Sequence, residues 1–530
     1  MADDPASGAS RPLRVDATVD AAVEVTDHGV TAAEVVRVAR DEVKAGLTDG
    51  ARATMAASAA LIDGFLAADE PVYGVTTGFG SLATTSIPVE RTAELQVALL
   101  RSHAAGMGPP VEREVVRAMM LLRARSLAMG CSGARPEVAE GLLAMLNAGL
   151  TPVVHEHGSL GASGDLAPLA EAALALIGEG EVCDRDGRQR PASEALAQAG
   201  LTPVVLRAKE GLALINGTDG ILGMLVLALA DLRRLLQVAD ITGAMTVEAL
   251  LGTDRAFAAD LQALRPQPGQ AVSASNLRRL LAGSAIVASH REGDPRVQDA
   301  YSLRCTPQVH GAARDTIDHA ERVAGFELVA AIDNPMILRD GRVESCGNFH
   351  GAPLAYVCDF LAIAIADLGA LVERRTDRLL DRTRSQGLPP FLAPDAGVDS
   401  GMMIAHYAQA AMVAENRRLA VPAGVDTVPT SAMQEDHVSM GWGAARKLRR
   451  SVANLGRILA VELTCAARGL DLRAPLAPAA GTGAALAAVR AVVAGPGPDR
   501  WLAPELAAVD ALVMSGPLVE AVEQAIGALE

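Results

Sequence analysis

The chain has 530 residues, which is longer than one ordinary hydrophobic core, so we expect one very large helical unit or two closely packed domains. Half of the residues are apolar but only 2% are aromatic, a composition that favours close-packed helices of Leu, Ala and Val over sheets. The formal net charge of −16 excludes the basic surface that nucleic-acid binding requires.

Other features of the composition indicate a cytoplasmic protein. The first ten residues are small and acidic and lack the basic and apolar regions of a secretory signal. Apolar stretches such as GILGMLVLALADL contain Asp and are shorter than the roughly 18 residues of a membrane span, so no membrane partner is expected. The six cysteines are scattered without Cys-x-x-Cys pairs, which predicts free thiols and no zinc site.

The N-terminal part of the chain is predicted to contain helices punctuated by loops. Residues 1–20 mix Asp, Pro, Ser and Gly without periodicity and are predicted to form a disordered tail. A helical pattern follows at about 31–70, with Thr31 as its expected N-cap. Gly-rich, loop-like segments then come at 73–80, 103–110, 155–165 and 184–190. We assign residues 21–215 to an N-terminal domain.

Beyond residue 215 the pattern changes to long stretches with apolar residues at helical spacing. These stretches are 217–252, 308–331, 351–382, 401–420 and 438–470. A Pro- and Gly-rich segment at 474–499 separates a last pair of short helices. We therefore predict a mainly α-helical fold, in which residues 216–530 form a long central bundle with C-terminal helices, and the smaller N-terminal domain carries a reactive loop.

The reactive loop is predicted from Ala162-Ser163-Gly164, which lies in a Gly-flanked turn before a helix that Asp165 is expected to cap. Gly164 lacks a side chain, so its amide nitrogen can approach the carbonyl group of Ala162. Cyclisation with loss of two waters would turn Ser163 into a methylidene group on an imidazolone ring. That ring is a strong electrophile, and the helix N-terminus would favour negative charge developing on it. An Ala-Ser-Gly tripeptide alone is more often an ordinary loop.

Further segments in a fixed chain order distinguish this turn from an ordinary loop. They are YGVTTGFG (73–80), RSHAAGMG (101–108), GSLGASGDLAPL (158–169), KEGLALINGTDG (209–220), VQDAYSLRCTPQVHG (297–311), GNFHGAP (347–353), AENRRLA (414–420) and PTSAMQEDHVSMG (429–441). With them the sequence resembles the histidine and phenylalanine ammonia-lyase family over about residues 70–470. The resemblance implies a 4-methylidene-imidazol-5-one group formed from Ala162, Ser163 and Gly164 with no external cofactor. It also implies a homotetramer whose sites draw residues from several chains.

The resemblance further implies roles for single residues. Tyr73 or Glu415 would remove the β-proton of an amino-acid substrate, although the ordinary tyrosine pKa near 10 would have to be lowered for this task. Arg304 would grip the substrate carboxylate with its guanidinium fork. Four more residues would line the pocket, two of them (Asn216 and Tyr301) steadying the electrophile and the substrate amine: Asn216, Gln298, Tyr301 and Phe349. Attack on the electrophile by the substrate amine and attack by its ring both remain open.

Substrate choice is predicted from the pair Ser102-His103, which faces the substrate side chain in enzymes of this family. Enzymes for phenylalanine carry Phe-Leu there and enzymes for tyrosine carry His-Leu, whereas Ser-His is the pair of the histidine enzymes. A neutral His can bond to an imidazole nitrogen, a contact that a phenyl ring cannot answer. Glu415 matches a glutamate that would hold the same imidazole. We therefore expect L-histidine as substrate and trans-urocanate as product.

Two rival functions remain open. The first is a phenylalanine or tyrosine ammonia-lyase or a tyrosine 2,3-aminomutase, and the second is an inactive helical scaffold. Two positions depart from the family pattern: Glu171 stands where the histidine enzymes usually have His and the phenylalanine enzymes Tyr, and Met433 stands where many members have Asn. Glu171 places a carboxylate close behind the reactive turn, so its effect on substrate choice is open.

Overall fold

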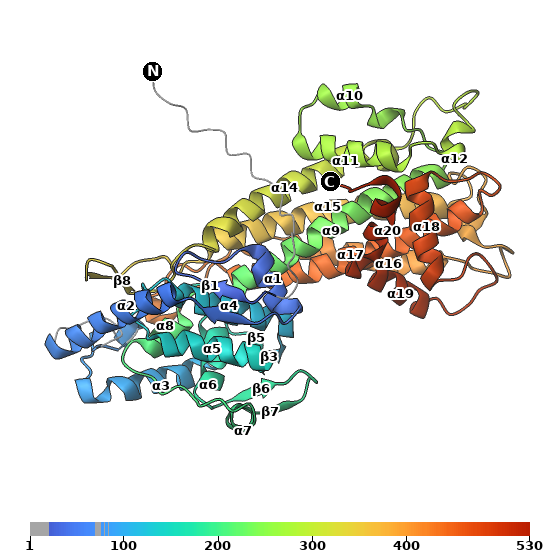
Figure 1. Ribbon diagram of the computed structural model, residues 1–530. Coiled ribbons are helices and arrows are strands. Elements are labelled where there is room, and N and C mark those ends of the chain that lie inside the picture. Colours follow the sequence, from blue (N-terminus) through green and yellow to red (C-terminus); the bar gives the residue numbers. More distant parts are fainter. Residues whose placement is uncertain (1–20, 69–75, 79, 83) are drawn as a thin grey trace, which may run out of the picture. The chain divides into compact units, whose positions relative to one another are not determined.

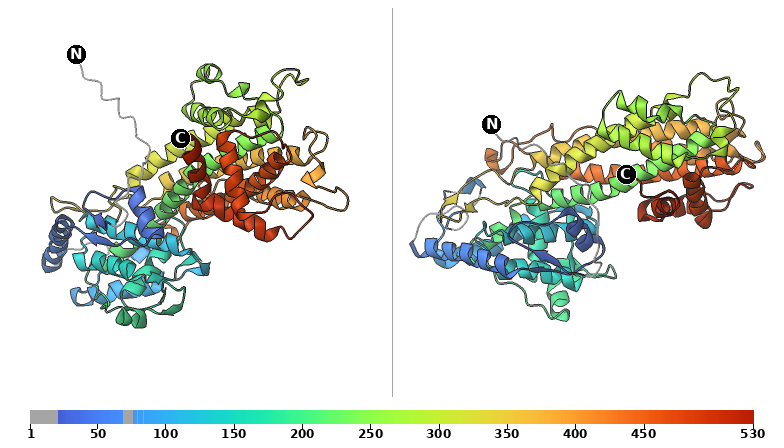
Figure 2. Two further views of the ribbon diagram at one scale, coloured as in Figure 1. Left: turned by 45° about the vertical axis from the view of Figure 1, so that its right-hand side comes forward. Right: turned by 45° about the horizontal axis from the view of Figure 1, so that its top comes forward.

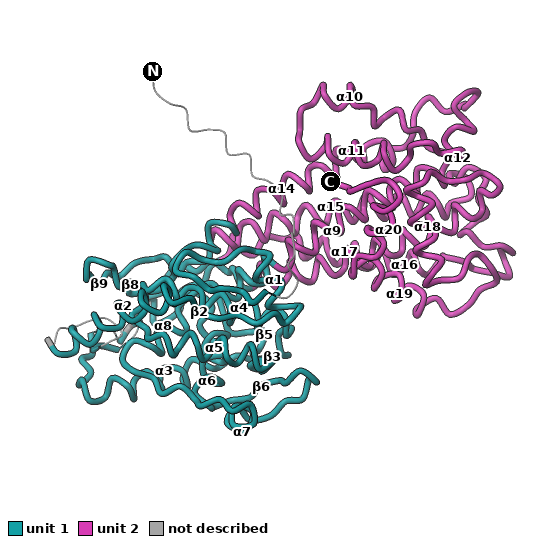
Figure 3. The backbone as a smooth tube through the Cα atoms, in the orientation of Figure 1, with its two compact units in different colours: residues 1–226, 324–351, 427–442 teal, residues 227–323, 352–426, 443–530 magenta. Residues whose placement is uncertain are grey.

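The protein is described by a computed structural model of residues 21–68, 76–78, 80–82 and 84–530. The chain divides into two compact units, shown in different colours in Figure 3. Unit 1 contains the chain up to residue 226 together with 324–351 and 427–442, and unit 2 contains 227–323, 352–426 and 443–530. The expected disordered tail and Tyr73 lie outside the described residues.

Unit 1 consists of short and medium-length helices with small two- and three-stranded sheets (Figure 1). Its helices are α1 (Ala32–Arg40), α2 (Asp49–Ala68), α3 (Thr92–His103), α4 (Arg113–Ala128), α5 (Pro136–Ala148), α6 (Leu166–Leu176), α7 (Ala192–Gln198) and α8 (Glu210–Ile215), with 3-10 turns η1 (Gly80–Leu82), η2 (Val89–Arg91) and η5 (Ser431–Met433). Its strands are β1 (Val23–Val25), β2 (Ala45–Leu47), β3 (Met107–Pro110), β4 (Thr151–Pro152), β5 (His155–His157), β6 (Glu181–Cys183), β7 (Gln189–Pro191), β8 (Met336–Ile337) and β9 (Val343–Glu344). Strands β1 and β2 pair in parallel, whereas the other named strands pair antiparallel as β3–β5, β4–β6–β7 and β8–β9.

The central helix of unit 1 is α4, in which every residue from Val115 to Ala128 is buried. It packs against α1 and α5. Its buried Arg123 donates hydrogen bonds to the carbonyl groups of Asn216 and Ile332, each at 2.9 Å. A buried guanidinium is tolerated only when its donors find acceptors, so these bonds tie the end of α8 to the core.

Unit 2 is a bundle of long helices with shorter helices packed beside it. Figures 1 and 2 show α14, α15 and the later parts of α9 and α17 running side by side. The helices are α9 (Asp219–Ala249), α10 (Ala259–Ala263), α11 (Pro268–Leu280), α12 (Ala285–Ala288), α13 (Tyr301–Arg304), α14 (Thr306–Glu327), α15 (Ala352–Leu380), α16 (Met403–Leu419), α17 (Gly441–Asp471), α18 (Ala480–Val492), α19 (Ala503–Ser515) and α20 (Pro517–Ile526), with η3 (Arg255–Phe257) and η4 (Pro390–Leu392). The five predicted long helices are all present, within a few residues of their expected ends. The predicted mainly α-helical fold with a long bundle is confirmed.

Two predictions for the N-terminal half need adjustment. The helical pattern at 31–70 is broken into α1 and α2 by the short strand β2, and Thr31 caps α1 in a capping box with Glu34. The compact units also do not follow one cut in the sequence, because unit 1 takes in two segments from beyond residue 323. Both of these later segments contact the reactive turn, as described below.

Among the described residues, two helical stretches are long and apolar enough to cross a membrane by length and composition alone. They are Glu210–Ala249, in which the apolar window is 100% buried, and Ala352–Leu380, in which it is 56% buried. Buried core helices of a bundle have the same composition, so this test does not single out a membrane span.

Candidate active site

The reactive turn Ala162-Ser163-Gly164 connects β5 to α6, and its backbone leaves no room for a side chain at its glycines. Gly164 has a φ of +81°, and a Cβ atom there would lie 2.2 Å from the carbonyl oxygen of Gly217. Gly161 has a φ of +67°, and its Cβ would lie 2.2 Å from Oγ of Ser439. Left-handed backbone in such close contact requires glycine, so the sequence specifies this turn at two points.

Two later segments of unit 1 fasten the turn. Ser439 donates a hydrogen bond from Oγ to the carbonyl oxygen of Gly161 at 3.0 Å, and the Met440 N–H bonds to the Leu160 carbonyl at 2.8 Å. The Gly351 N–H approaches the same Gly161 carbonyl at 3.4 Å. The GNFHGAP and PTSAMQEDHVSMG segments therefore meet at the turn, although each is far from it in sequence.

Asp165 follows the turn and is the N-cap residue of α6, as expected, but its side chain does not bond to that helix. Oδ2 instead accepts the N–H groups of Gly220 and Ile221 in the first turn of α9, at 2.9 and 3.0 Å. Oδ1 accepts a hydrogen bond from Oγ of Ser159 at 2.8 Å. The carboxylate thus caps α9, whose N-terminal N–H groups have no partners within their own helix.

The environment of Asp165 is fully buried. Burial raises the pKa of its carboxyl group to about 7, against an ordinary 3.8, and the nearby charge of Asp219 acts in the same direction. The hydrogen bonds from Ile221, Ser159 and Gly220 oppose this rise. Burial is the larger effect, so the pKa of this buried carboxyl group, next to the reactive turn, lies close to neutral pH.

Ser163 makes its side-chain contact with Glu435, a residue that the sequence patterns did not single out. Ser163 donates from Oγ to Oε1 of Glu435 at 3.3 Å, and Oε2 of that carboxylate accepts the hydroxyl of Thr430 at 2.9 Å. Glu435 lies in the matched segment PTSAMQEDHVSMG, so the signal was present. The sequence analysis gave the glutamate role to Glu415 and passed over this position.

His103 is the last residue of α3, and its ring is held in one tautomer. Nδ1 lies 3.0 Å from the carbonyl oxygen of Leu99, which can only accept, so Nδ1 carries the proton. Burial lowers the pKa of His103 below its ordinary value, while the nearby carboxylate of Glu435 opposes this shift. The ring is therefore neutral at pH 7, and Nε2 carries the lone pair.

Asn216 and Phe349 also belong to unit 1. Asn216 ends α8 and is 3% exposed; its Nδ2 donates to the Asn334 carbonyl at 2.8 Å. Its Oδ1 is buried and has no hydrogen-bond partner among the described residues, so it can accept a bond from a ligand. Phe349 is half-buried and lies two residues before Gly351, whose N–H contacts the turn.

Three predicted binding residues gather in unit 2, around the short helix α13. Arg304 donates from Nη1 to Oε1 of Gln298, and its guanidinium lies 4.6 Å from the centre of the Tyr301 ring. Arg304 Nε is buried and has no partner among the described residues. Tyr301 is 71% exposed. The cluster can therefore offer a charged N–H group to a carboxylate beside an exposed phenol ring.

Glu415 lies on α16 of unit 2 and is already paired. Its carboxylate accepts a hydrogen bond from Asn454 Nδ2 at 2.8 Å and forms an ion pair with Arg450 at 2.6 Å. These two contacts lower the pKa of Glu415 below its ordinary value. A carboxylate held in its charged form by an arginine is a weaker base than a free one.

The backbone of the turn fits a prosthetic group made from its own residues. The residues at 161 and 164 can only be glycine, Ala162 is buried with a minimal side chain, and the Ser163 hydroxyl is half-exposed. No side chain therefore obstructs closure of a ring across residues 162–164. Among the described residues there is no cluster of three His, Cys, Asp or Glu side chains that could hold a metal ion.

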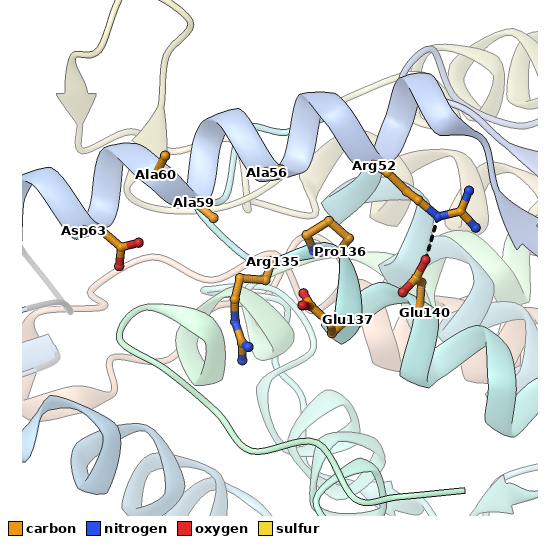
Figure 4. A pocket seen from close by; sticks show the side chains of 9 residues that line it. All are labelled: Arg52, Ala56, Ala59, Ala60, Asp63, Arg135, Pro136, Glu137 and Glu140. Carbon is orange, nitrogen blue, oxygen red and sulfur yellow. Dashed lines mark hydrogen bonds and ion pairs between the residues drawn. The ribbon is translucent and has the colours of Figure 1, made fainter.

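A hollow elsewhere in unit 1 offers no comparable chemistry. It has a volume of about 360 Å3 and lies between α2 and the start of α5 (Figure 4). It is lined by Arg52, Ala56, Ala59, Ala60, Asp63, Arg135, Pro136, Glu137 and Glu140. Arg52 bonds to Glu140 at 2.6 Å, and Arg135 bonds to Glu210 at 2.7 Å. Its cations are thus already paired with carboxylates of the protein.

The helical fold agrees with comparisons with known proteins. The model of the family "Aromatic amino acid lyase" matches residues 30–491, so the chain belongs to this family. It is 62% identical over 510 residues to the histidine ammonia-lyase of Streptomyces griseus, with 96% of this chain and 99% of that one covered.

Solved structures of similar enzymes share the helical fold of this chain. The chain is similar to the tyrosine aminomutase of Streptomyces globisporus, with a TM-score of 0.91 and 37% identity over 96% of this chain and 100% of that one. It is also similar to the histidine ammonia-lyase of Trypanosoma cruzi, with a TM-score of 0.88 and 38% identity over 96% of each chain.

Proposed function

We propose that this protein eliminates ammonia from L-histidine to give trans-urocanate, with an electrophile that it forms from Ala162, Ser163 and Gly164. The observation that carries the choice of substrate is the tautomer of His103. With Nδ1–H held by the Leu99 carbonyl, Nε2 is an acceptor that matches the N–H group of a substrate imidazole. A phenyl ring has no such donor and would leave this acceptor unpaired.

The prosthetic group would supply an electrophile that makes the substrate's nitrogen a better leaving group. The chain's own residues would bind the substrate and move its protons. Arg304 would hold the carboxylate next to Tyr301, with Gln298 orienting the guanidinium. Asn216 would accept an N–H of the substrate amine through its unpartnered Oδ1. Phe349 would pack against the substrate.

Removal of the β-proton needs a base, for which the sequence analysis named Tyr73 and Glu415. The hydrogen bonds of the two glutamates favour a change to the second of these. Tyr73 remains a candidate. For the glutamate we propose Glu435 in place of Glu415, because Glu435 contacts Ser163, whereas Glu415 is tied to Arg450 and Asn454. A positioned general base contributes about 100- to 10,000-fold to a rate, so Glu435→Gln should lower kcat by at least about 100-fold. The matched variant Glu415→Gln should lower it far less.

We further propose that the enzyme is a cytoplasmic homotetramer. All six cysteines lie in the described part of the chain and are free thiols, which fits a reducing compartment. Helices α15 and α16 expose large apolar side chains, which fits contact with further copies: Tyr356, Phe360, Ile363, Ile404 and Tyr407. Mass photometry at micromolar concentration should give four times the 54.6 kDa chain mass, and a monomer would refute the assembly.

The electrophile is tested by the variant Ser163→Ala. Without the Ser163 hydroxyl no methylidene can form, so the variant should release no urocanate from L-histidine. The intact mass of the wild type should be about two waters below that of its encoded chain, whereas the variant should show its full encoded mass. Near-normal turnover by Ser163→Ala would show that the reaction does not use this group.

A second candidate is an aminomutase, which is favoured by the structural similarity to the tyrosine aminomutase of Streptomyces globisporus. Such an enzyme would return the amine to the β-carbon. Chromatography of the products would detect a β-amino acid, and its absence with every aromatic amino acid would exclude this activity.

A further inference from the structure

Glu171 is a largely buried carboxylate on α6 that contacts two other segments of unit 1. Oε2 accepts the main-chain N–H of His155 at 2.8 Å, and Oε1 lies 2.8 Å from Nδ1 of the same residue. A carboxylate that accepts a hydrogen bond from Nδ1 fixes the His155 ring with its proton there. On the other side is Gly106, where a Cβ atom would lie 2.6 Å from Oε1. The Glu171 side chain is only 10% exposed.

These segments lead to the two halves of the site. His155 begins β5, which continues into the reactive turn around Ser163, and α6 leaves that turn and carries Glu171. Gly106 ends the tight turn that follows His103, in which the Ala105 N–H bonds to the His103 carbonyl at 2.8 Å. Glu171 thus joins both flanks of the reactive turn to the segment that carries His103.

The carboxylate is not free to bind a ligand. Both of its oxygens are engaged with His155, and its face toward the 104–106 segment is closed by Gly106. Glu171 can therefore affect the site only through the segments that it holds in place. Charge-assisted hydrogen bonds are about twice as strong as neutral ones. The Glu171 carboxylate can therefore hold the segment of His155 more firmly than a neutral side chain would.

We propose that Glu171 is a positioning residue for recognition of the substrate ring: by holding His155 and packing against Gly106, it sets His103 at the correct distance from the reactive turn. This inference rests on the proposed function. It assigns the unusual carboxylate at position 171 to alignment of the histidine-reading residue, with no contact to substrate and no part in forming the electrophile.

The test is a double-mutant cycle between Glu171 and His103, measured as kcat and KM for L-histidine. Glu171→Gln keeps the shape of the side chain but removes its charge. The Gln amide has one acceptor oxygen where Glu171 has two, so it cannot accept both the main-chain N–H and the Nδ1–H of His155. We expect it to raise KM by at least about tenfold, as for a lost hydrogen bond to a charged group, with a smaller change in kcat. In a His103→Leu background the same substitution should change KM by less than about twofold, because the residue it positions is absent.

Two further variants separate this role from general damage. His155→Gln removes the ring partner from the other side and should give the same rise in KM without adding to that of Glu171→Gln, which also provides the test if Glu171→Gln does not fold. Glu179→Gln is the matched control: Glu179 bonds to Arg101 of α3 at 2.9 Å but lies at the surface, so its loss should leave KM within about twofold.

The outcomes are distinct. An unchanged KM in Glu171→Gln, or an equal rise with and without His103, would overturn the inference. An intact mass of the Glu171→Gln variant without the loss of two waters would also overturn it, since Glu171 would then serve electrophile formation. If the wild type forms no urocanate, the proposed function fails. If the wild type is active and the cycle shows no coupling, only the role of Glu171 fails.

Discussion

Replacing Asp165 by Ala removes the carboxylate that accepts two main-chain N–H groups at the start of α9, and it leaves both groups buried without a partner. Asp165→Asn is the matched comparison. The Asn oxygen can accept the Gly220 and Ile221 N–H groups as Oδ2 does now, and the Asn amide can donate to Ser159 Oγ. Both variants remove the same ionisable group, so the difference between them isolates the hydrogen bonds.

The size of that difference follows from the number of lost partners. A buried N–H group left unsatisfied costs about 1–3 kcal/mol, so Asp165→Ala should unfold with a free energy about 2–6 kcal/mol below that of Asp165→Asn. Both groups are in the fully buried first turn of α9, where water cannot replace the carboxylate.

Trp442 gives a local signal for this measurement. It is 3% exposed, and a Cβ atom at Gly220 would lie 2.4 Å from its ring, so its fluorescence reports on the contact that Asp165 maintains. The second tryptophan, Trp501, is 80% exposed and should change little on unfolding. Urea unfolding followed by this fluorescence should place the midpoint of Asp165→Ala well below that of Asp165→Asn. Equal midpoints for the two variants would refute the assignment of Asp165 as the cap of α9.

Three further predictions concern charge and recognition. Because burial raises the pKa of Asp165 in the folded state to about 7 from 3.8, its contribution to stability is fully present below about pH 3.8 and is lost as the pH rises through 7. The free energy of unfolding in urea should therefore lose this pH dependence in Asp165→Asn. An unchanged pH profile in that variant would contradict the burial argument. Arg304→Lys keeps the charge but loses the two-pronged grip, so kcat/KM for L-histidine should fall by the equivalent of about 1–3 kcal/mol, and unchanged kinetics would remove Arg304 from the carboxylate site. Changing Ser102-His103 to Phe-Leu should narrow the ratio of kcat/KM for histidine over phenylalanine, which we expect to be about four orders of magnitude in the wild type; an unaltered ratio would show that another residue reads the ring.

Much of the fold could be predicted from the sequence because it depends on local patterns. Apolar residues at helical spacing gave the positions of α14 and α15 to within a few residues. The break between α1 and α2 was missed, because the three-residue strand β2 is stabilised by pairing with β1 and has little pattern of its own.

The site could be predicted only in part, since its contacts join distant segments. The glycines around Ser163 indicated the reactive turn directly. Asp165 was expected to cap the helix next to it, but its partners in α9 are 55 and 56 residues later in the chain. Glu435 is 272 residues from Ser163, and no local spacing connects the two. The contact of Glu171 with Gly106 likewise depends on how β3 pairs with β5.

The identity of the product tests the central claim most directly. Purified wild-type protein should be incubated separately with L-histidine, L-phenylalanine and L-tyrosine, and the ultraviolet spectrum of each mixture followed, since urocanate, cinnamate and coumarate absorb at different wavelengths. We predict urocanate from L-histidine and almost no product from the other two. Cinnamate or coumarate as the main product would contradict histidine as the substrate, and no product from any of the three would contradict the lyase activity itself.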